Sequence, residues 1–284
     1  MPEMPEVETI ARKLRRALIG KRIAAVELSG LPLRRPIADS FAFDLPGRTV
    51  SKIRRRGKYL VIRLEPRLFW LVHLGMSGRI HYGAGAAVPQ AHTHAVVRFS
   101  DGSELHYRDH RRFGLLAAYD VARPAEIPEL RALGADPLGA RFTARWLSAE
   151  LRRRRTEIKS FLLDQRRIAG LGNIYACEAL FRARIHPARR CHRITAVEAA
   201  RLVAAVRAVL QAAVRRRGTT FSDFMDSDGE PGDNQNFLRV FQREGRRCRR
   251  CRTPIERLRQ GNRSSFLCPR CQRAGVAGSV RGGV

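Results

Sequence analysis

Four cysteines near the end of the chain have the spacing of a metal site. Cys248 and Cys251 form one Cys-x2-Cys pair, and Cys268 and Cys271 form a second pair after sixteen intervening residues. Each pair can present two thiolates from one tight turn, and together they supply the tetrahedral sulfur ligands of a zinc site. Because four thiolates leave no coordination position open for a substrate, we expect one structural Zn²⁺ here.

The stretch between the two cysteine pairs, TPIERLRQGNRSSF, predicts a β-hairpin that turns near Gln260 and Gly261. Arg263 would then lie close to the tip of this hairpin. The two remaining cysteines, Cys177 and Cys191, stand outside the spacing, and we interpret them as ordinary core or surface thiols.

The chain begins MPEMPEVETI, which places two prolines and three carboxylates in its first eight residues. The apolar residues that follow recur every three or four positions and predict an amphipathic helix: Val7, Ile10, Leu14 and Leu18. Pro5 suits the first turn of that helix, and Glu6 complements its positive end. The helix leaves Pro2 and Glu3 unexplained, because both precede it.

The composition predicts a polyanionic partner. The 284 residues suffice for two or three domains with apolar cores, and 55 Lys and Arg against 26 Asp and Glu give a formal charge of +29. Only 5 of the basic residues are lysines, so each lysine merits attention. Neither a signal peptide nor an apolar run of about 18 residues is evident, and we expect a cytoplasmic protein without a membrane partner.

The period of the apolar residues divides the chain. Residues 22–120 alternate as strands do, with a hairpin signal at Asp101-Gly102, and predict an all-β domain of sandwich type. A proline-rich stretch at residues 123–138 marks a boundary. Residues 144–217 have helical periodicity, interrupted by the glycine-rich turn AGLGN at residues 169–173.

The clearest helix follows Thr195. Thr195 and Glu198 have the spacing of a capping box, and Gly218 stands where the helix should stop. The next residues, GTTFSDFMDSDGEPGDNQNF, are polar and glycine-rich, and predict a long functional loop. A zinc hairpin and a large positive charge by themselves indicate nucleic-acid binding only, which a transcription factor would also satisfy.

Seven motifs narrow this choice. MPEMPEVET, RRRGKYL, HLGMSG, RDHRRFG, AGLGNIYACEALF, DSDGEPG and the four-cysteine hairpin follow one another in an order that resembles the formamidopyrimidine-DNA glycosylases, bacterial base-excision enzymes that remove oxidised purines. The resemblance extends from Pro2 to about Gln272. It implies an α+β multidomain fold with an N-terminal β-sandwich, a helix-two-turns-helix domain and a C-terminal four-cysteine zinc β-hairpin, with DNA held in the cleft between.

We therefore expect a catalytic β-sandwich domain with its leading helix at 1–135. A helix-two-turns-helix DNA-binding domain with the lesion loop should follow at 136–235, then a zinc-finger domain at 236–275 and a disordered tail at 276–284. The resemblance implies a bifunctional glycosylase and AP lyase that acts on damaged double-stranded DNA. We expect it to act as a monomer in the cytoplasm, associated with the nucleoid.

The resemblance also gives Pro2 a role. Once Met1 is removed, the secondary amine of Pro2 is the nucleophile that attacks C1′, displaces the base and forms an iminium, and β- and δ-elimination follow. An α-amino group titrates near 7.7 to 8.0, against about 10.4 for lysine, so far more of it is neutral at pH 7. Glu3 is the implied general acid/base. Lys58 and Arg263 are the implied phosphate contacts that assist the β and δ steps.

Further residues match the family by motif alone. The implied backbone contacts to DNA are His73, His92, Arg111, Arg154 and Asn173. Because the damaged nucleotide must leave the stack, a void-filling trio is implied as well: Met76, Arg111 and Phe113. From the sequence alone Met76 and Phe113 would fit a core, and Lys58 a solvated strand position. Glu6 could contribute to the lesion pocket or only to the charge at the helix end.

Three departures from the usual family pattern bear on base preference: His110, Ser222 and the pair Phe241-Gln242. Two alternatives therefore accompany the oxidised-purine prediction. The first is the endonuclease VIII-like preference for oxidised pyrimidines. The second is a zinc-ribbon DNA-binding protein without catalysis, which would have no reason to retain the set of Pro2, Glu3, Lys58 and Arg263.

Overall fold

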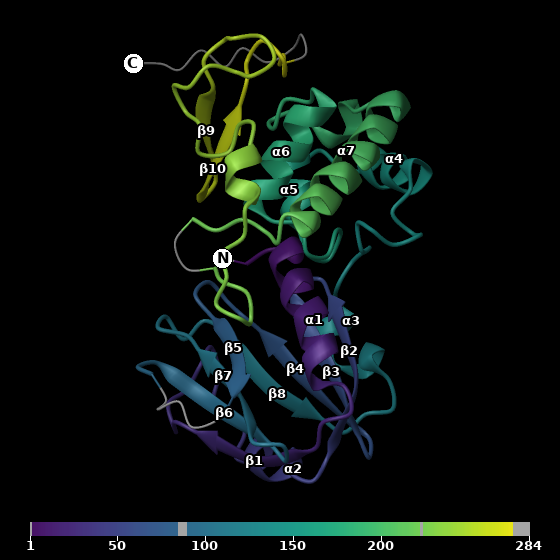
Figure 1. Ribbon diagram of the computed structural model, residues 1–284. Helices are drawn as coiled ribbons and strands as arrows, with labels where there is room; N and C mark the ends of the chain where they lie inside the picture. The colour runs from purple at the N-terminus through teal and green to yellow at the C-terminus, as the bar shows by residue number, and fades with distance from the viewer. Residues whose placement is uncertain (1, 85–89, 222–223, 275–284) are drawn as a thin grey trace. The chain divides into compact units, whose positions relative to one another are not determined.

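The computed structural model describes residues 2–84, 90–221 and 224–274 (Figure 1). Met1, Ser222 and the predicted tail at 276–284 lie outside the described residues. The chain packs into two compact units. The first unit comprises the chain up to Leu133 together with Gln211–Asn236, and the second comprises Gly134–Leu210 and the chain from Phe237 onward.

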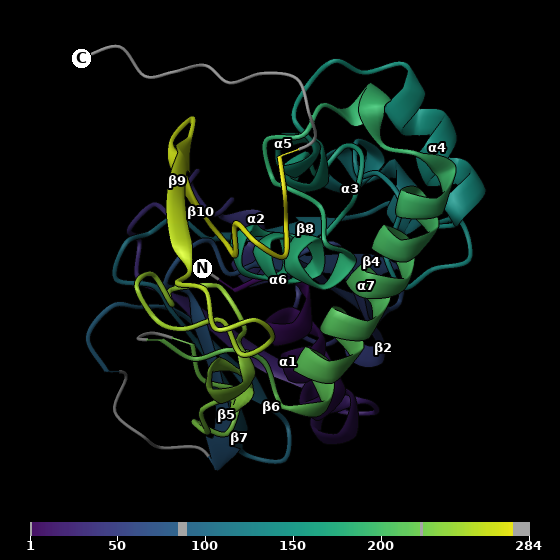
Figure 2. The same ribbon diagram turned by 90° about the horizontal axis from the view of Figure 1, so that it is seen from above.

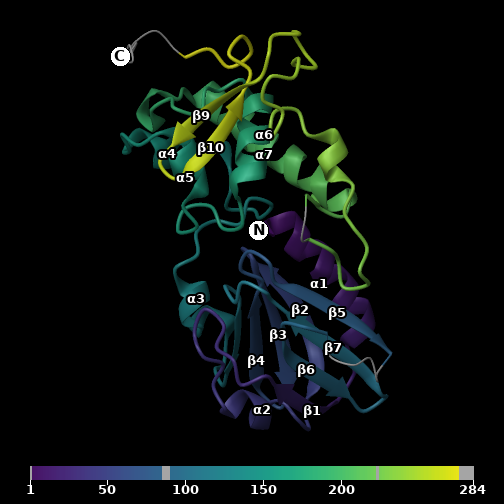
Figure 3. The same ribbon diagram turned by 90° about the vertical axis from the view of Figure 1, so that its left-hand side faces the viewer.

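The first unit is built on two four-stranded antiparallel sheets (Figure 3). One sheet has the order β1 (Ile23–Leu28), β6 (Thr93–Phe99), β7 (Ser103–Arg108) and β5 (Arg79–Ala84). The other has the order β2 (Thr49–Arg56), β3 (Tyr59–Glu65), β4 (Leu68–His73) and β8 (Leu115–Tyr119). These sheets confirm the predicted β-sandwich.

Helix α1 (Met4–Leu18) packs against β2 and β3 and contributes to the same core. The residues of the predicted apolar stripe are all buried in that core, with neighbours from both sheets: Val7, Ile10, Leu14 and Leu18. The predicted hairpin is also present, since β6 and β7 join at Asp101-Gly102 and Gly102 takes a φ of +84°. Such a left-handed conformation favours glycine.

Four further helices are short. They are α2 (Ser40–Asp44), η1 (Pro124–Glu126), α3 (Pro128–Arg131) and, in the second unit, α4 (Ala144–Arg152). The prolines of η1 and α3 occupy first turns, where a missing N–H removes no helical hydrogen bond. The alternation seen in the sequence does not indicate α2, which is a single turn around the buried Phe41.

The second unit gathers its helices in one group (Figure 2). After α4 come α5 (Ile158–Leu163), α6 (Asn173–Ala183), η2 (Cys191–Arg193) and α7 (Ala196–Arg215), of which the residues up to Leu210 belong to this unit. The predicted capping box is present: the Thr195 N–H donates to Glu198 and the Glu198 N–H donates to Thr195 Oγ1. Gly218, with a φ of +84°, closes the helix by donating its N–H to the Ala213 carbonyl.

The zinc hairpin consists of β9 (Glu256–Gln260) and β10 (Arg263–Leu267). Gln260 pairs with Arg263 across the turn, as predicted. A small apolar cluster packs this region against α6 and includes Cys177, Phe181, Phe241, Phe266 and two of the four motif cysteines, Cys248 and Cys268. Among the residues that the structure describes, no helix combines the length and apolar character needed to cross a membrane.

Candidate active site

The N-terminus of α1 holds a buried pair of carboxylates. The Glu3 N–H donates to Glu6 Oε2 at 2.8 Å, and the Glu3 side chain accepts from the backbone N–H of Glu6, which completes a capping box. Pro2, Glu3 and Glu6 are all buried. The sequence pattern places Glu3 outside the helix, but in the structure it is the N-cap residue and the helix begins at Met4. Glu3 therefore lies beside Pro2 with its backbone fixed.

Each carboxylate oxygen of Glu6 accepts a backbone hydrogen bond. While Oε2 accepts from Glu3, Oε1 accepts the backbone N–H of Thr219 at 2.7 Å. Gly218 approaches so closely that an added Cβ would lie 2.9 Å from Glu6 Oε1. Glu6 therefore joins the start of the chain to the segment that follows α7. The Glu6 carboxylate therefore does more than place a negative charge at a helix end, because each of its oxygens accepts a backbone N–H.

Lys58 lies in the turn between β2 and β3, next to Gly57, which has a φ of +60°. The sequence allows a solvated strand position for this lysine, whereas the structure leaves only 8% of it exposed. Its positive charge contributes to lowering the pKa of His73. The turn, rather than strand alternation, therefore determines where the Lys58 side chain lies.

His73, the last residue of β4, is a neutral hydrogen-bond donor. Burial, together with the charges of Lys58 and Arg34, lowers its pKa to about 4. Its Nδ1 accepts the backbone N–H of Gly75 at 3.0 Å, so the ring proton is on Nε2. The ring also packs against Tyr59, with 4.7 Å between centroids. A neutral imidazole that carries its proton on Nε2 can donate to a phosphate without adding charge.

The lowered pKa of His73 makes stability depend on pH in a defined direction. Between pH 6.5, the usual value for histidine, and about 4, the unfolded chain binds a proton that the folded chain does not. The free energy of unfolding should therefore fall as pH decreases through this window. We expect His73→Gln to lose this part of the pH dependence, measured by denaturant unfolding at several pH values. Parallel curves for the two proteins would contradict the assignment.

The predicted void-filling residues lie on two linked turns. Met76 is 37% exposed and Phe113 46% exposed, so neither belongs to the core that their apolar character suggests. The Arg111 guanidinium lies over the Phe113 ring, 4.9 Å from its centroid. Gly75 meets the second turn backbone to backbone, because an added Cβ would come within 2.4 Å of the Phe113 carbonyl carbon. The structure therefore brings the trio together on one exposed surface.

Asp109 holds these two turns in place. It is 1% exposed, and its carboxylate accepts the Ser77 hydroxyl at 2.5 Å and the Gly114 N–H at 2.8 Å. The same residue donates its backbone N–H to the carbonyl of His92, an exposed residue with a φ of +65°. His110, one of the departures from the family pattern, is also exposed, and its ring lies 6.3 Å from that of His92.

In the second unit Asn173 and Arg263 line one surface pocket, together with Phe241 and Gln242. Asn173 is the first residue of α6, where helix N–H groups lack helical partners. Its Nδ2 donates to the Ser264 carbonyl at 3.0 Å, and its buried Oδ1 has no partner in the described part of the chain. The pocket therefore combines a helix start, a side-chain amide and an exposed guanidinium, three groups that favour a bound anion.

Arg154 lies outside that pocket, just beyond α4. Its guanidinium pairs with Glu150 at 3.0 Å and lies over the ring of Phe161. A phosphate at Arg154 would therefore share this cation with Glu150.

Sequence reasoning did not identify Lys159, which is 1% exposed on α5. Its Nζ donates to the Ser264 carbonyl at 2.9 Å and to Ser265 Oγ, both on β10 next to Arg263. A buried ammonium so placed orients the strand that carries Arg263. The scarcity of lysine was the available signal. Asp109 carried no such signal, because its role depends on contacts with Ser77 and Gly114.

The four motif cysteines converge as the spacing predicts. Their Sγ atoms all lie within 4.8 Å of one another. Ligands at about 2.3 Å from one ion would be separated by about 3.8 Å, so the cluster fits a single tetrahedral Zn²⁺. Cys248 and Cys268 are buried and the other two are half-buried, which suits a structural site. The site binds one structural zinc ion, as predicted.

Comparison with known proteins agrees with this geometry. Residues 1–116 match the formamidopyrimidine-DNA glycosylase N-terminal domain, residues 133–225 match the H2TH domain of the same enzymes, and residues 245–274 match a zinc finger found in FPG and IleRS. A formamidopyrimidine-DNA glycosylase of Pelotomaculum thermopropionicum is 45% identical over 275 residues, covering 96% of this chain and 99% of that protein.

Solved structures give the same result. MutM (Fpg) of Thermus thermophilus superposes with a TM-score of 0.85 at 38% identity, covering 95% of this chain and 98% of the other. Lactococcus lactis Fpg in complex with abasic-site DNA gives a TM-score of 0.88 at 29% identity, with coverages of 96% and 100%. The chain belongs to the formamidopyrimidine-DNA glycosylase family, and the predicted fold of β-sandwich, helix-two-turns-helix domain and zinc hairpin is confirmed.

Proposed function

We propose that this chain, a DNA glycosylase and AP lyase that removes oxidised purines in base-excision repair, reacts through the amine of Pro2. The observation that carries the proposal is the buried arrangement of Pro2, Glu3 and Glu6 at the N-terminus of α1. Removal of Met1 turns Pro2 into a secondary amine. The positive end of α1 favours its unprotonated form.

In the first step the Pro2 nitrogen forms a bond to C1′ and loses its proton, and the damaged base leaves with the electron pair of the glycosidic bond and takes up a proton in exchange. Glu3 protonates the sugar ring oxygen, so the ring opens and the nitrogen becomes part of an iminium. The iminium acidifies the C2′ proton, whose loss expels the 3′ phosphate. Elimination at the 5′ side follows in the same manner. Lys58 supports the first elimination and Arg263 the second by contact with phosphate.

The base must leave the helical stack before Pro2 can reach C1′. The exposed trio of Met76, Arg111 and Phe113 is suited to fill the resulting space, since it combines a thioether, a guanidinium and an aromatic ring on linked turns. Several groups then contact the phosphates. They are His73 as a neutral donor, His92 next to the same turns, Arg154, and the pocket of Asn173 and Arg263.

The partner in this proposal is damaged double-stranded DNA, bound by a monomer in the cytoplasm in association with the nucleoid. Support comes from the charge of +29 and from Lactococcus lactis Fpg, which has been crystallised with abasic-site DNA and, as a mutant, with DNA containing Fapy-dG. The functional domains are then 1–135, 136–235 with the lesion loop, and 236–275. Affinity dominated by phosphate contacts should decrease steeply with salt.

The test is a borohydride trap with an 8-oxoguanine:cytosine duplex, followed by mass mapping of the linked residue. We expect reduction of the iminium to leave a covalent adduct at Pro2, in protein whose intact mass shows that Met1 is gone. An abasic duplex serves as the control substrate, because it requires no base excision. If Met1 is absent and neither duplex gives an adduct, the imine mechanism is wrong and binding without catalysis becomes the better explanation.

A second specificity, for oxidised pyrimidines, has one observation in its favour. Lactococcus lactis Fpg has also been crystallised with DNA containing an oxidised pyrimidine. Of the departures from the family pattern, Ser222 lies outside the described residues, whereas Phe241 and Gln242 line the pocket next to Arg263. Single-turnover excision from a panel of purine and pyrimidine lesions, each opposite its usual partner base, would distinguish the two specificities.

A further inference from the structure

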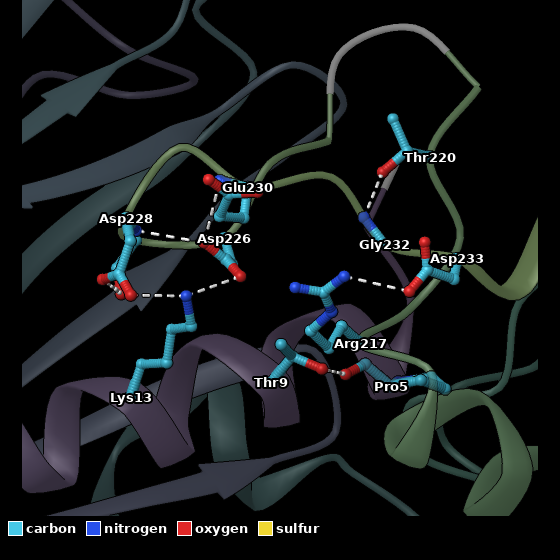
Figure 4. Close-up of polar contacts among 11 residues, drawn as sticks. Pro5, Thr9, Lys13, Arg217, Thr220, Asp226, Asp228, Glu230, Gly232 and Asp233 are labelled. Carbon is cyan, nitrogen blue, oxygen red and sulfur yellow. Dashed lines mark hydrogen bonds and ion pairs between the residues drawn. The ribbon is translucent and has the colours of Figure 1, made fainter.

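Helix α1 contacts the segment that follows α7 at two places. One contact is a hydrogen bond, and the other is an ion pair of a lysine that the proposed mechanism does not use. Near the start of the helix, Glu6 accepts the N–H of Thr219. Further along, Lys13 Nζ lies 2.7 Å from Asp226 Oδ2 and 2.5 Å from Asp228 Oδ2 (Figure 4). The positions of Glu6 and Lys13 differ by seven residues, which places both on one face of the helix.

The Asp226 carboxylate is buried and accepts hydrogen bonds from the backbone of its own turn. Its side chain has no exposed surface, and its Oδ1 accepts the backbone N–H groups of Asp228 and Glu230, each at 3.1 Å. The other oxygen faces Lys13 (Figure 4). A buried carboxylate that loses its cation is costly, so the position of this turn depends on Lys13. Although burial acts in the opposite direction, Asp226 and Asp228 raise the pKa of Lys13.

The same turn is fastened to the sandwich. The Ser227 carbonyl accepts the N–H of Tyr82 in β5 at 2.9 Å, and Phe224 packs into the core that contains Val7 and Ile10 of α1. At the other side of the segment, Thr220 Oγ1 donates to the Phe224 carbonyl and accepts the Gly232 N–H. Thr219, Thr220 and Phe224 are thus held relative to the helix that begins beside Pro2 and Glu3.

We propose that Lys13 is a positioning residue for base excision: by pairing with Asp226 it holds Thr219, Thr220 and Phe224 in register with Pro2 and Glu3. The inference rests on the proposed function. Glu6 joins Thr219 to Glu3, the residue next to the nucleophile, so Thr219 and its described neighbours lie beside the nucleoside under attack. They can therefore contact the base, and an abasic substrate has no base to contact.

The expected effect is specific to one substrate. Lys13→Met should lower the single-turnover rate of 8-oxoguanine excision by about tenfold, since small displacements near a reacting centre can cost up to about a hundredfold. Strand cleavage at a preformed abasic site should stay within about twofold of wild type, because that step involves no base. Lys13→Arg keeps the charge and should restore most of the excision rate.

Asp226→Asn tests the pair from the other side. It keeps an oxygen that can accept from Asp228 and Glu230 and removes only the charge, so the turn itself should persist. We expect the same selective loss of excision, and no further loss in the Lys13→Met/Asp226→Asn double variant. Lys21→Met is the matched control, because Lys21 pairs with Asp101 and its side chain is 24% exposed, against 26% for Lys13.

The outcomes separate cleanly. If Lys13→Met and Asp226→Asn match wild type on both substrates, or lose both activities equally while remaining folded, Lys13 does not position the base and the inference is wrong. If Lys21→Met shows the same selective loss, any ion pair of the first unit has this effect and the inference is wrong as well. If wild-type protein cleaves neither substrate, the proposed function itself has failed.

Discussion

Glu3→Gln should bind lesion-containing duplex as tightly as wild type, yet excise 8-oxoguanine about a thousandfold more slowly, a loss within the usual range for a general acid. Glutamine has nearly the shape of glutamate, and its amide oxygen can still accept the N–H of Glu6, so the capping box and the position of Pro2 should survive. What disappears is the proton that Glu3 delivers to the sugar oxygen.

The measurement combines fluorescence anisotropy for binding with single-turnover excision. Glu8→Gln is the matched control, because Glu8 lies on the same helix and pairs with Arg12, Arg15 and Arg55 at its side chain instead of facing Pro2. Glu8→Gln should excise at close to the wild-type rate. Full excision by Glu3→Gln would remove Glu3 from the mechanism, and weak binding by Glu3→Gln would mean that the residue serves mainly to hold the fold.

Cys251→Ser should release the zinc ion and reduce affinity for DNA by at least about a hundredfold, since structural zinc contributes about 10 kcal/mol or more to small zinc domains. The cluster that packs the hairpin against α6 includes Cys248 and Cys268 themselves, so the metal organises part of the local core. Without it, β10 and Arg263 lose their fixed place beside Asn173.

Zinc content by elemental analysis and binding by anisotropy would be measured together. Cys191→Ala is the control: this thiol also belongs to the second unit, but it is buried against Thr156 instead of in the cluster, and burial raises its pKa. It should keep one zinc per chain. Tight lesion binding by Cys251→Ser protein from which zinc has gone would show that the hairpin is not required for the clamp on DNA.

Local features of this protein could be predicted from the sequence because their partners are near in the chain. The cysteine pairs, the apolar stripe of α1, the capping box at Thr195 and the turn at Gly102 each depend on spacings of a few residues within a helix, a hairpin or a knuckle. Such patterns follow from helical and strand periodicity and from turn geometry. The order of seven such motifs then sufficed to indicate the family.

Only the tertiary structure decided how separate segments combine into a site. Glu6 reaches Thr219 and Lys13 reaches Asp226, although more than two hundred residues separate the members of each pair. Apolar character assigned Met76 to the core, whereas the packing of two turns around Asp109 exposes it. Burial and distant charges likewise set the protonation of His73. Periodicity records which face of an element is apolar; it does not record which remote backbone group that face will meet.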